Sequence, residues 1–450
     1  MHRLSSFDAQ LDRVVPLFSS LLQRANFRFL SGGLIIKASA IGIRTLITTA
    51  LLYLFNSTEA GYYFLGSSII QILTPLVFMG ITPVLLREVT LAHKKEDYGT
   101  IWSWFDYHLI YLGTIALCAT PILWFSAPYL VDYVYDGNPK MLKVVQYSSL
   151  SLLPITLMWN SQSFFRGMGH HYRAYLAEDS LLMIVHAITL YPLISKYGIL
   201  GAIISYVVGA YAAAIWGIWS CFRLIPKANR KLINRPYQSF RLKGWPVICS
   251  AFLLRLFTWG GSFTLSIISM EWISAYTVII NILTLPIVAT GVIGNVYTPQ
   301  WVVAADEDNR ESLASSSRKA SRYTFIVVAG LSLGAIVFAN PLLKYVFNLT
   351  DPSIVFALRI ALFVAMLRTV YGHTSLLLDV TNHAQKTLIS FFLSLVTFVP
   401  ILYFGVIEFG LLGAVSSYAI TLVVMSFWGN IFVQRDLHIH PGLWGRPKES

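Results

Sequence analysis

The chain has 450 residues, of which 56% are hydrophobic and only 12% are charged. A soluble domain carries about 25% charged residues, so this composition excludes a soluble globular protein and indicates one that crosses a membrane many times. The net charge of +12 would suit a nucleic-acid-binding protein, but a membrane protein concentrates positive charge in its cytoplasmic loops. We therefore expect membrane lipids, and no nucleic acid, among its partners.

The first 28 residues precede the first long apolar stretch. They mix charged residues with leucine, valine and phenylalanine, and no short apolar core leads into a small-residue cleavage site. The sequence therefore does not predict a secretory signal. We expect residues 1–28 to form an amphipathic segment that lies on the cytoplasmic surface of the membrane.

The first predicted membrane-spanning helix, residues 29–55, carries two cations in its interior. Lys37 and Arg44 are seven residues apart and therefore lie on one face of the helix. A cation at this depth costs about 2.5–3.5 kcal/mol even on the lowest insertion scale, so such residues face a protein interior or a wet cavity. The pair predicts a cavity that binds an anion.

Apolar stretches of membrane-spanning length recur along the rest of the chain. Each has about 20 or more residues, which is enough for a helix to cross a bilayer. The sequence therefore predicts an all-α polytopic membrane protein with about 12 transmembrane helices. The predicted spans are residues 29–55, 61–86, 106–130, 144–165, 175–195, 198–222, 246–268, 272–300, 323–347, 353–378, 387–407 and 410–433.

Positive charge is distributed unevenly between the two sides of the membrane. Of the 33 Lys and Arg residues, 24 fall in segments on the side of the N-terminus. Only Lys140, Lys143, Lys196 and Lys344 fall on the opposite side. Because cytoplasmic loops carry the excess of Lys and Arg, we predict a multi-pass protein with both termini in the cytoplasm.

The longest basic join, residues 222–243, divides the chain into two halves of six spans that repeat. Repeats of this kind are parallel, related by an axis along the membrane normal, and enclose a central cleft. We predict an N-terminal six-helix bundle at 29–222, a basic cytoplasmic linker at 223–245, a C-terminal six-helix bundle at 246–434 and a cytoplasmic tail at 435–450. A shift of 212 aligns eight identical residues, namely Gly198, Leu200, Gly201, Ala202, Ser205, Tyr206, Trp216 and Gly217 with Gly410, Leu412, Gly413, Ala414, Ser417, Tyr418, Trp428 and Gly429.

The repeat also pairs two intramembrane arginines. A shift of 211 aligns Arg44 with Arg255, and each lies roughly 14–21 Å along its helix from the cytoplasmic end. Guanidinium stays charged and binds phosphate oxygens through two parallel hydrogen bonds, so both arginines fit a phosphate or pyrophosphate in a central cavity. Lys37 and Arg368 are predicted to extend this lining. The alternative is that these cations are tied structurally to helix carbonyls or buried acids.

Residue types that would support other chemistry are missing from the sequence. Spans one, two and seven have no Asp or Glu in their interiors, whereas a cation-exporting antiporter needs a buried carboxylate. There is no GxxxxGK[ST] nucleotide-binding loop, no metal-ligand spacing and no nucleophile motif. We therefore predict a protein that is not an enzyme, without catalytic residues, a metal or a cofactor.

Helix-breaking residues gather in spans two and eight. Prolines and glycines kink helices and free backbone groups, as expected where helices bend during a conformational change. The alternative is the ordinary use of Gly and Pro in transmembrane helices. The candidate hinge residues are Pro75, Gly80 and Pro83 in span two and Pro286 and Gly291 in span eight.

The segment from Gly32 to Val89 resembles a known family. It joins the arginine-bearing first helix to the sequence FNSTEAGYYFLGSSIIQILTPLVFMGITPVLLREV. The turn from Glu59 to Tyr63 resembles the family's E-x-G-x-Y loop, and YGILGAIISY is similar to its G-x-x-G-A entry to helix six. With the twelve-helix pattern, the chain resembles the polysaccharide flippases (Wzx-type, O-antigen translocases) of the multidrug/oligosaccharidyl-lipid/polysaccharide exporter (MOP) superfamily.

The resemblance implies an alternating-access flippase in the bacterial inner (cytoplasmic) membrane. Its partners would be an undecaprenyl-pyrophosphate-linked oligosaccharide, an anionic lipid-linked glycan, and the polysaccharide polymerase machinery. The glycan would reach the periplasmic leaflet for O-antigen, capsule or exopolysaccharide biosynthesis. The alternative is a multidrug/cation antiporter of the same superfamily. A glycan polymerase or ligase needs long periplasmic loops, and the longest predicted here, about 130–143, is too short for one.

Overall fold

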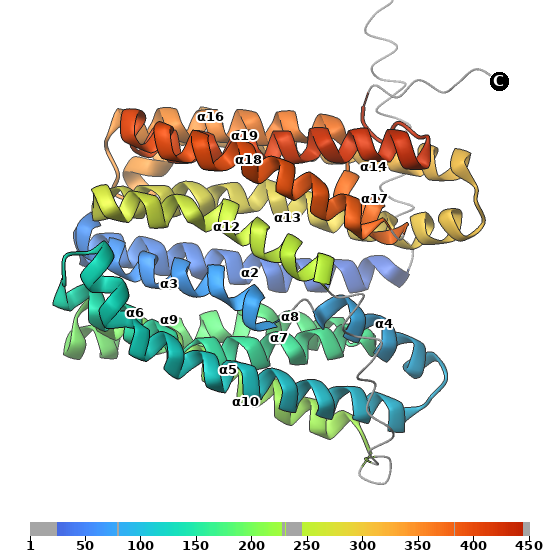
Figure 1. The fold of residues 1–450 in the computed structure, drawn as a ribbon, viewed down its shortest axis with the longest axis horizontal. Coiled ribbons are helices and arrows are strands. Elements are labelled where there is room, and N and C mark those ends of the chain that lie inside the picture. The colour runs from blue at the N-terminus through green and yellow to red at the C-terminus, as the bar shows by residue number, and fades with distance from the viewer. Residues whose placement is uncertain (1–24, 79–80, 227–229, 231–244, 382, 444–450) are drawn as a thin grey trace, which may run out of the picture.

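The computed structural model describes residues 25–78, 81–226, 230, 245–381 and 383–443. Within these ranges the chain is helical and contains no strand. The helices form two bundles, an N-terminal lobe drawn in blue to green and a C-terminal lobe drawn in yellow to red (Figure 1). This confirms the predicted all-α fold with two bundles.

Each lobe is built from one half of the chain. The N-terminal lobe contains α2 (Ala25–Leu54), α3 (Ser57–Phe78), α4 (Ile81–Lys94), α5 (Tyr98–Val134), α6 (Pro139–Ser149), α7 (Leu152–Gly167), α8 (His171–Tyr175), α9 (Leu181–Tyr197) and α10 (Ile199–Leu224). The C-terminal lobe contains α12 (Trp245–Ile268), α13 (Met270–Asp306), α14 (Arg310–Val337), α15 (Ala339–Pro341), α16 (Pro352–Arg368), α17 (Thr374–Val380), α18 (Ala384–Phe409) and α19 (Leu411–Phe432).

Ten of the twelve predicted spans fall on described helices that could each cross a membrane, and the other two fall on a bent helix pair and on a shorter apolar helix. Ten helical runs are long and apolar enough to cross a membrane, and α8 with α9 forms an eleventh, bent by 40°. The remaining span falls on α2, whose described apolar part is Ser39–Leu54. The predicted boundaries differ in places, because polar caps rather than the end of the apolar stretch start some helices. Asp97, for example, accepts a hydrogen bond from the Thr100 amide (3.0 Å) and begins α5 well before the predicted residue 106.

The internal repeat appears in the backbone as well as in the sequence. Gly198 joins α9 to α10 and Gly410 joins α18 to α19, each at positive φ (60° and 54°), a conformation that favours glycine. Three residues later, Gly201 and Gly413 pack directly on the preceding helix. A Cβ atom would strike the carbonyl oxygen of Leu193 in the first case and of Gly405 in the second, positions that are also 212 residues apart.

The two lobes meet at one end of the molecule, which we call the closed end. There α3 packs against α12 and α13, and Gly61 lies so close to the backbone carbonyl of Met270 that a Cβ atom would collide with it. Hydrogen bonds between the lobes run from Tyr53 Oη to Tyr345 O (2.8 Å), from Ser274 Oγ to Ser57 O (2.6 Å), from Asn281 Nδ2 to Thr48 Oγ1 (3.3 Å) and between Tyr135 Oη and Ser266 Oγ (2.7 Å).

The predicted segments outside the bundles fall largely beyond the described residues. Of the predicted N-terminal segment 1–28, only residues 25–28 are described, and they belong to α2. The predicted linker 223–245 is described at its two ends and at Arg230. The predicted tail 435–450 is described up to residue 443, and there Pro441 accepts a hydrogen bond from Ser321 (2.7 Å).

Candidate functional site

Arg255, predicted to line a central cavity, reaches from one lobe to the other. It lies on α12, and its guanidinium carbon is 5.5 Å from the ring centroid of Trp159 on α7 of the N-terminal lobe. On the side of its own lobe it lies close enough to Tyr418 to act on that hydroxyl electrostatically. The guanidinium therefore lies between the lobes, in contact with an aromatic face.

Arg368, the predicted contributor from span ten, converges on the same tyrosine. It is the last residue of α16, and its Nε donates a hydrogen bond to Ser426 Oγ on α19 (3.3 Å). It too acts electrostatically on the buried Tyr418. The C-terminal lobe therefore holds two guanidinium groups around one tyrosine.

Arg44 has an equivalent setting in the N-terminal lobe. It lies on α2, is partly buried, and acts electrostatically on the buried Tyr63 of α3. Tyr63 Oη shares a hydrogen bond with His186 Nε2 (3.0 Å), and His186 Nδ1 bonds Ser205 Oγ. These contacts fix Tyr63 between α3 and the α9–α10 pair, and the tyrosine in turn lies beside the guanidinium.

Tyrosine is the residue type that the sequence prediction of the site omitted. Tyr206, whose ring packs edge-on against that of His186 (5.7 Å between ring centroids), is the repeat partner of Tyr418 at a shift of 212. Both tyrosines therefore belong to the eight identities, which was the signal that could have found them. A phenolic hydroxyl can accept a hydrogen bond from guanidinium while other N–H donors stay available for an anion. We call the two groups, Arg44 with Tyr63 and Arg255 and Arg368 with Tyr418, the arginine–tyrosine clusters.

The other predicted site and hinge residues are placed less completely. Lys37 lies on α2, two turns before Arg44, but its side chain lies outside the described part of the structure. Gly80 also lies outside it, and so does the side chain of Pro83 on α4. Their roles stay predictions.

The proline positions differ between the two lobes. Pro75 is buried within α3, which ends three residues later at Phe78, and α4 begins at Ile81. Pro286 and Gly291 lie inside α13, which continues as one helix from Met270 to Asp306. Bending at either place during a conformational change stays a prediction.

The motif turn between α2 and α3 holds the closed end together. Glu59 forms an ion pair with Lys140 in the first turn of α6, and Tyr62 Oη accepts a hydrogen bond from Nδ2 of Asn138, the N-cap of that helix (3.2 Å). Gly61 permits the close contact with Met270 of the other lobe. The Glu59 and Gly61 positions of the E-x-G-x-Y pattern thus contact other helices at this end, whereas its tyrosine, Tyr63, bonds His186 within the N-terminal lobe.

Two acidic residues at the end of the molecule opposite the closed end have different surroundings. Glu178 pairs with Arg166 (3.1 Å), as expected for an acid beside a basic loop. Asp379, at the end of α17 and outside the spans, accepts a hydrogen bond from Thr387 Oγ1 (2.8 Å). Asp379 is exposed, yet the protein around its carboxyl desolvates it, and this raises its pKa to about 6 against the lowering effect of the Thr387 bond.

Metal and nucleophile chemistry receive no support from the described residues. Within them, no group of three or more His, Cys, Asp and Glu side chains is placed to hold a metal ion. His186 and His373 are buried, and each shares a hydrogen bond with a neighbouring hydroxyl, His373 with Thr324 (2.8 Å). What the site offers is cationic groups between two lobes.

The fold and these clusters define a membrane protein of two helical bundles with partly buried arginines, one of which, Arg255, contacts the opposite lobe. Solved structures with this fold are multidrug resistance (MATE) transporters of the MOP superfamily. An inward-facing conformation of one such transporter matches with a TM-score of 0.73 at 18% identity, covering 89% of this chain and 94% of that one. An outward-facing conformation matches with a TM-score of 0.66 at 17% identity, covering 92% and 95%.

A third matched structure is described by the polarity of its own binding pocket. It is a MOP superfamily transporter from Pyrococcus furiosus, described as having a binding pocket of reverse polarity that suggests a different function. It matches with a TM-score of 0.66 at 16% identity, covering 91% of this chain and 94% of that one. No protein-family model matches the chain, and a sequence comparison with curated proteins finds no match. At these identities the similarity shows the fold.

Proposed function

We propose that the chain is an alternating-access flippase for an undecaprenyl-pyrophosphate-linked oligosaccharide. It would carry this lipid from the cytoplasmic to the periplasmic leaflet of the bacterial inner membrane, for surface polysaccharide such as O-antigen, capsule or exopolysaccharide. The observation that supports the proposal is the pair of arginine–tyrosine clusters. Three arginines from opposite lobes lie within membrane-spanning helices, and α2 and α12, which carry Arg44 and Arg255, contain no Asp or Glu.

Electrostatics favours an anionic substrate for this arrangement. A charge-assisted hydrogen bond contributes about 1.5–3 kcal/mol, and an arginine can make two such bonds to one phosphate. A cationic substrate would meet the same sign of charge, without a carboxylate on either of these helices to compensate. A pyrophosphate, with oxygens on two phosphorus atoms, can accept hydrogen bonds from both lobes at once.

The lobe contacts support the transport cycle that we propose. They join the lobes at the closed end, and with the predicted orientation this end is periplasmic. The higher TM-score to the inward-facing neighbour than to the outward-facing one agrees with a state that is open toward the cytoplasm. In the proposed cycle, the pyrophosphate binds between the lobes while the protein is open toward the cytoplasm. The closed-end contacts then break, and the glycan is released on the periplasmic side.

A multidrug/cation antiporter is the second candidate, and the structural neighbours favour it. Two of the matched structures are described as multidrug resistance transporters. The Pyrococcus furiosus transporter indicates that pocket polarity varies within this fold. The sign of the charge at the site therefore distinguishes the two candidate functions, and in this chain the arginines make it positive.

Transport by purified protein in proteoliposomes tests the two functions side by side. One set of vesicles carries a fluorescent undecaprenyl-pyrophosphate-linked oligosaccharide, and the other carries a cationic dye with an imposed proton or sodium gradient. We expect the protein to move the lipid-linked sugar between leaflets and to leave the dye where it is. Movement of the dye without movement of the lipid would reject the flippase and support the antiporter.

A further inference from the structure

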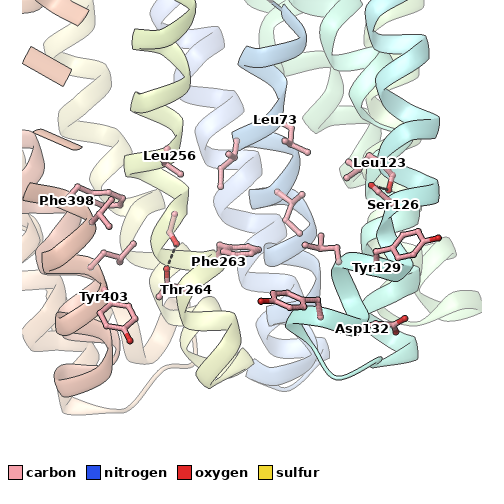
Figure 2. A pocket seen from close by; sticks show the side chains of 17 residues that line it. Leu73, Leu123, Ser126, Tyr129, Asp132, Leu256, Phe263, Thr264, Phe398 and Tyr403 are labelled. Atoms are coloured by element: carbon pink, nitrogen blue, oxygen red, sulfur yellow. Dashed lines mark hydrogen bonds between the residues drawn. The ribbon is translucent and has the colours of Figure 1, made fainter. Parts of the chain in front are cut away.

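A long apolar groove lies between the two lobes, and one of its lining residues, Leu256, follows Arg255 in the chain. Its volume is about 1250 Å³, and its walls come from α3 and α5 of the N-terminal lobe and α12 and α18 of the C-terminal lobe (Figure 2). The side chains that face it include Leu73, Leu123, Leu256, Phe263 and Phe398. Pockets for small molecules have volumes of about 300–1,000 Å³, so the groove is large enough for a longer ligand.

The groove walls offer hydrocarbon contacts. Ser126 and Thr264 also face the groove, but their hydroxyls donate to carbonyl oxygens of their own helices, those of Leu123 (3.3 Å) and Gly260 (3.1 Å). All four wall helices contain stretches long and apolar enough to cross a membrane. The groove therefore opens within the hydrocarbon region of the bilayer, and a hydrocarbon chain is the ligand that its walls suit.

One end of the groove carries the residues of a membrane–water interface. Tyr129 and Asp132 lie in that half of the groove on one wall and Tyr403 on the opposite wall, with Leu73 and Leu256 toward the other end (Figure 2). Tyr129 and Tyr403 are 79% and 59% exposed, as is common for the aromatic residues that mark the level of the lipid head groups. The groove runs from this level into the middle of the membrane.

The inner end of the groove adjoins the arginine site. Leu256, which faces the groove, directly follows Arg255 on α12. Consecutive residues of a helix point about 100° apart, and Arg255 turns instead to the ring of Trp159 in the other lobe. One short stretch of α12 thus presents hydrocarbon on one side and a guanidinium on the adjacent side.

We propose that this groove binds the polyprenyl chain of the lipid whose pyrophosphate the arginines bind. The proposal rests on the proposed function and adds to it a binding site for the lipid part of the substrate. An anionic group at mid-membrane, beside Arg255, can continue directly into the inner end of the groove. The head group of a phospholipid stays at the membrane–water interface, so a phospholipid in the groove would not place its phosphate beside Arg255.

Ligands that share a head group but differ in chain length test the groove. The wild-type protein in nanodiscs is titrated with undecaprenyl pyrophosphate and with isopentenyl pyrophosphate, whose chain is too short to occupy the groove. Val399→Trp fills the groove from α18. Val396→Trp is the matched control, because Val396 is also exposed on α18 but does not line the groove (54% and 72% exposed).

We expect Val399→Trp to weaken binding of undecaprenyl pyrophosphate by about tenfold and to change that of isopentenyl pyrophosphate by less than about twofold. Val396→Trp should change neither. If Val399→Trp keeps the preference for the long chain, the groove proposal is rejected while the arginine site stands. If the wild type binds neither pyrophosphate, the proposed function is rejected and the groove proposal with it.

A second measurement covers the case in which the tryptophan variant does not fold. A photoreactive amino acid replaces Leu123, on the opposite wall of the groove. Irradiation should attach undecaprenyl pyrophosphate at this position, and an excess of unlabelled undecaprenyl pyrophosphate should suppress the attachment. Attachment of phospholipid alone, with the polyprenyl lipid present, would overturn the proposal.

Discussion

Arg255 of the C-terminal lobe lies over the ring of Trp159 in the N-terminal lobe, with 5.5 Å between the guanidinium carbon and the ring centroid. A cation–π contact contributes about 0.5–1 kcal/mol at exposed sites and about 2 kcal/mol when desolvated. Since the partners belong to different lobes, the contact stabilises this arrangement of the lobes. An anion that draws Arg255 away from the ring would weaken it, so substrate binding and lobe movement can be coupled through this side chain.

Replacing Trp159 should therefore shift the conformational equilibrium. Trp159→Ala removes the aromatic face, and a loss of about 1 kcal/mol changes the ratio of the two states by roughly fivefold. Cysteines at Tyr53 and Tyr345, which meet across the closed end, should then be joined less efficiently by a short thiol cross-linker. Trp159→Phe keeps an aromatic face and is the control. Equal cross-linking in all three proteins would contradict this role of the contact.

The contact between Gly61 and Met270 predicts a second way to open the closed end. A methyl group at position 61 collides with the Met270 carbonyl group of the other lobe, and overpacking of this kind costs about 1–3 kcal/mol. Gly61→Ala should reduce the same cross-linking. Gly42→Ala is the matched control, because a Cβ atom there meets nothing within 4 Å. Unchanged cross-linking in Gly61→Ala would show that the lobes do not need this close approach.

The fold could be predicted from the sequence because its main signals are long and redundant. The twelve apolar stretches predict the helices, and the repeat of eight identities predicts two bundles. An error in one stretch does not alter either prediction. The boundaries depend on local chemistry instead. The Asp97 cap lengthens α5, and a break at Leu150 and Ser151 separates α6 from α7 within the predicted span 144–165. Hydropathy does not detect such features.

The repeated glycines allow a prediction about stability. Gly201 and Gly413 make the same contact in the two lobes, with the carbonyl oxygens of Leu193 and Gly405. Alanine at either position should lower the free energy of unfolding by about 1–3 kcal/mol, through the same collision in each lobe. Gly330→Ala, where a Cβ atom meets nothing within 4 Å, should be neutral or slightly stabilising because alanine favours a helix. Thermal unfolding of the purified variants measures these effects.

Asp379 predicts a pH dependence of stability. Its pKa of about 6 in the folded protein lies above the ordinary value of 3.8, so the folded state holds the proton more tightly than the unfolded state does. Stability should therefore fall as pH rises from about 4 to 6 and stay level above that. The exposure of Asp379 keeps the effect small. Asp379→Asn should remove this component from the unfolding temperature measured between pH 4 and 7, and a pH profile equal to that of the wild type would contradict this role of Asp379.

The site could be predicted only in part, because its arginines are visible in the sequence and their surroundings are not. A cation inside an apolar stretch is conspicuous, so Arg44, Arg255 and Arg368 could be selected as candidates from the sequence. Trp159 lies on α7 of the opposite lobe, and no spacing along the chain links it to Arg255. The groove depends on four helices from two lobes, which a sequence pattern cannot bring together.

The final prediction concerns Arg44 and Arg255 as ligands of one pyrophosphate. Loss of one charge-assisted contact should cost about 1.5–3 kcal/mol of substrate interaction. Arg44→Ala and Arg255→Ala should therefore abolish flipping of the lipid-linked sugar, with normal amounts of protein in the membrane. Arg→Lys at either position should be tolerated poorly, because ammonium keeps the charge but loses the paired donors. The double variant should be much less than additively worse, since both residues serve one ligand. Normal flipping by Arg44→Ala would refute the anionic site. A structural role is the other outcome. The alanine variants would then be lost from the membrane, and Arg→Lys would restore both the amount of protein and full transport, because lysine keeps the charge beside Tyr63 and Tyr418.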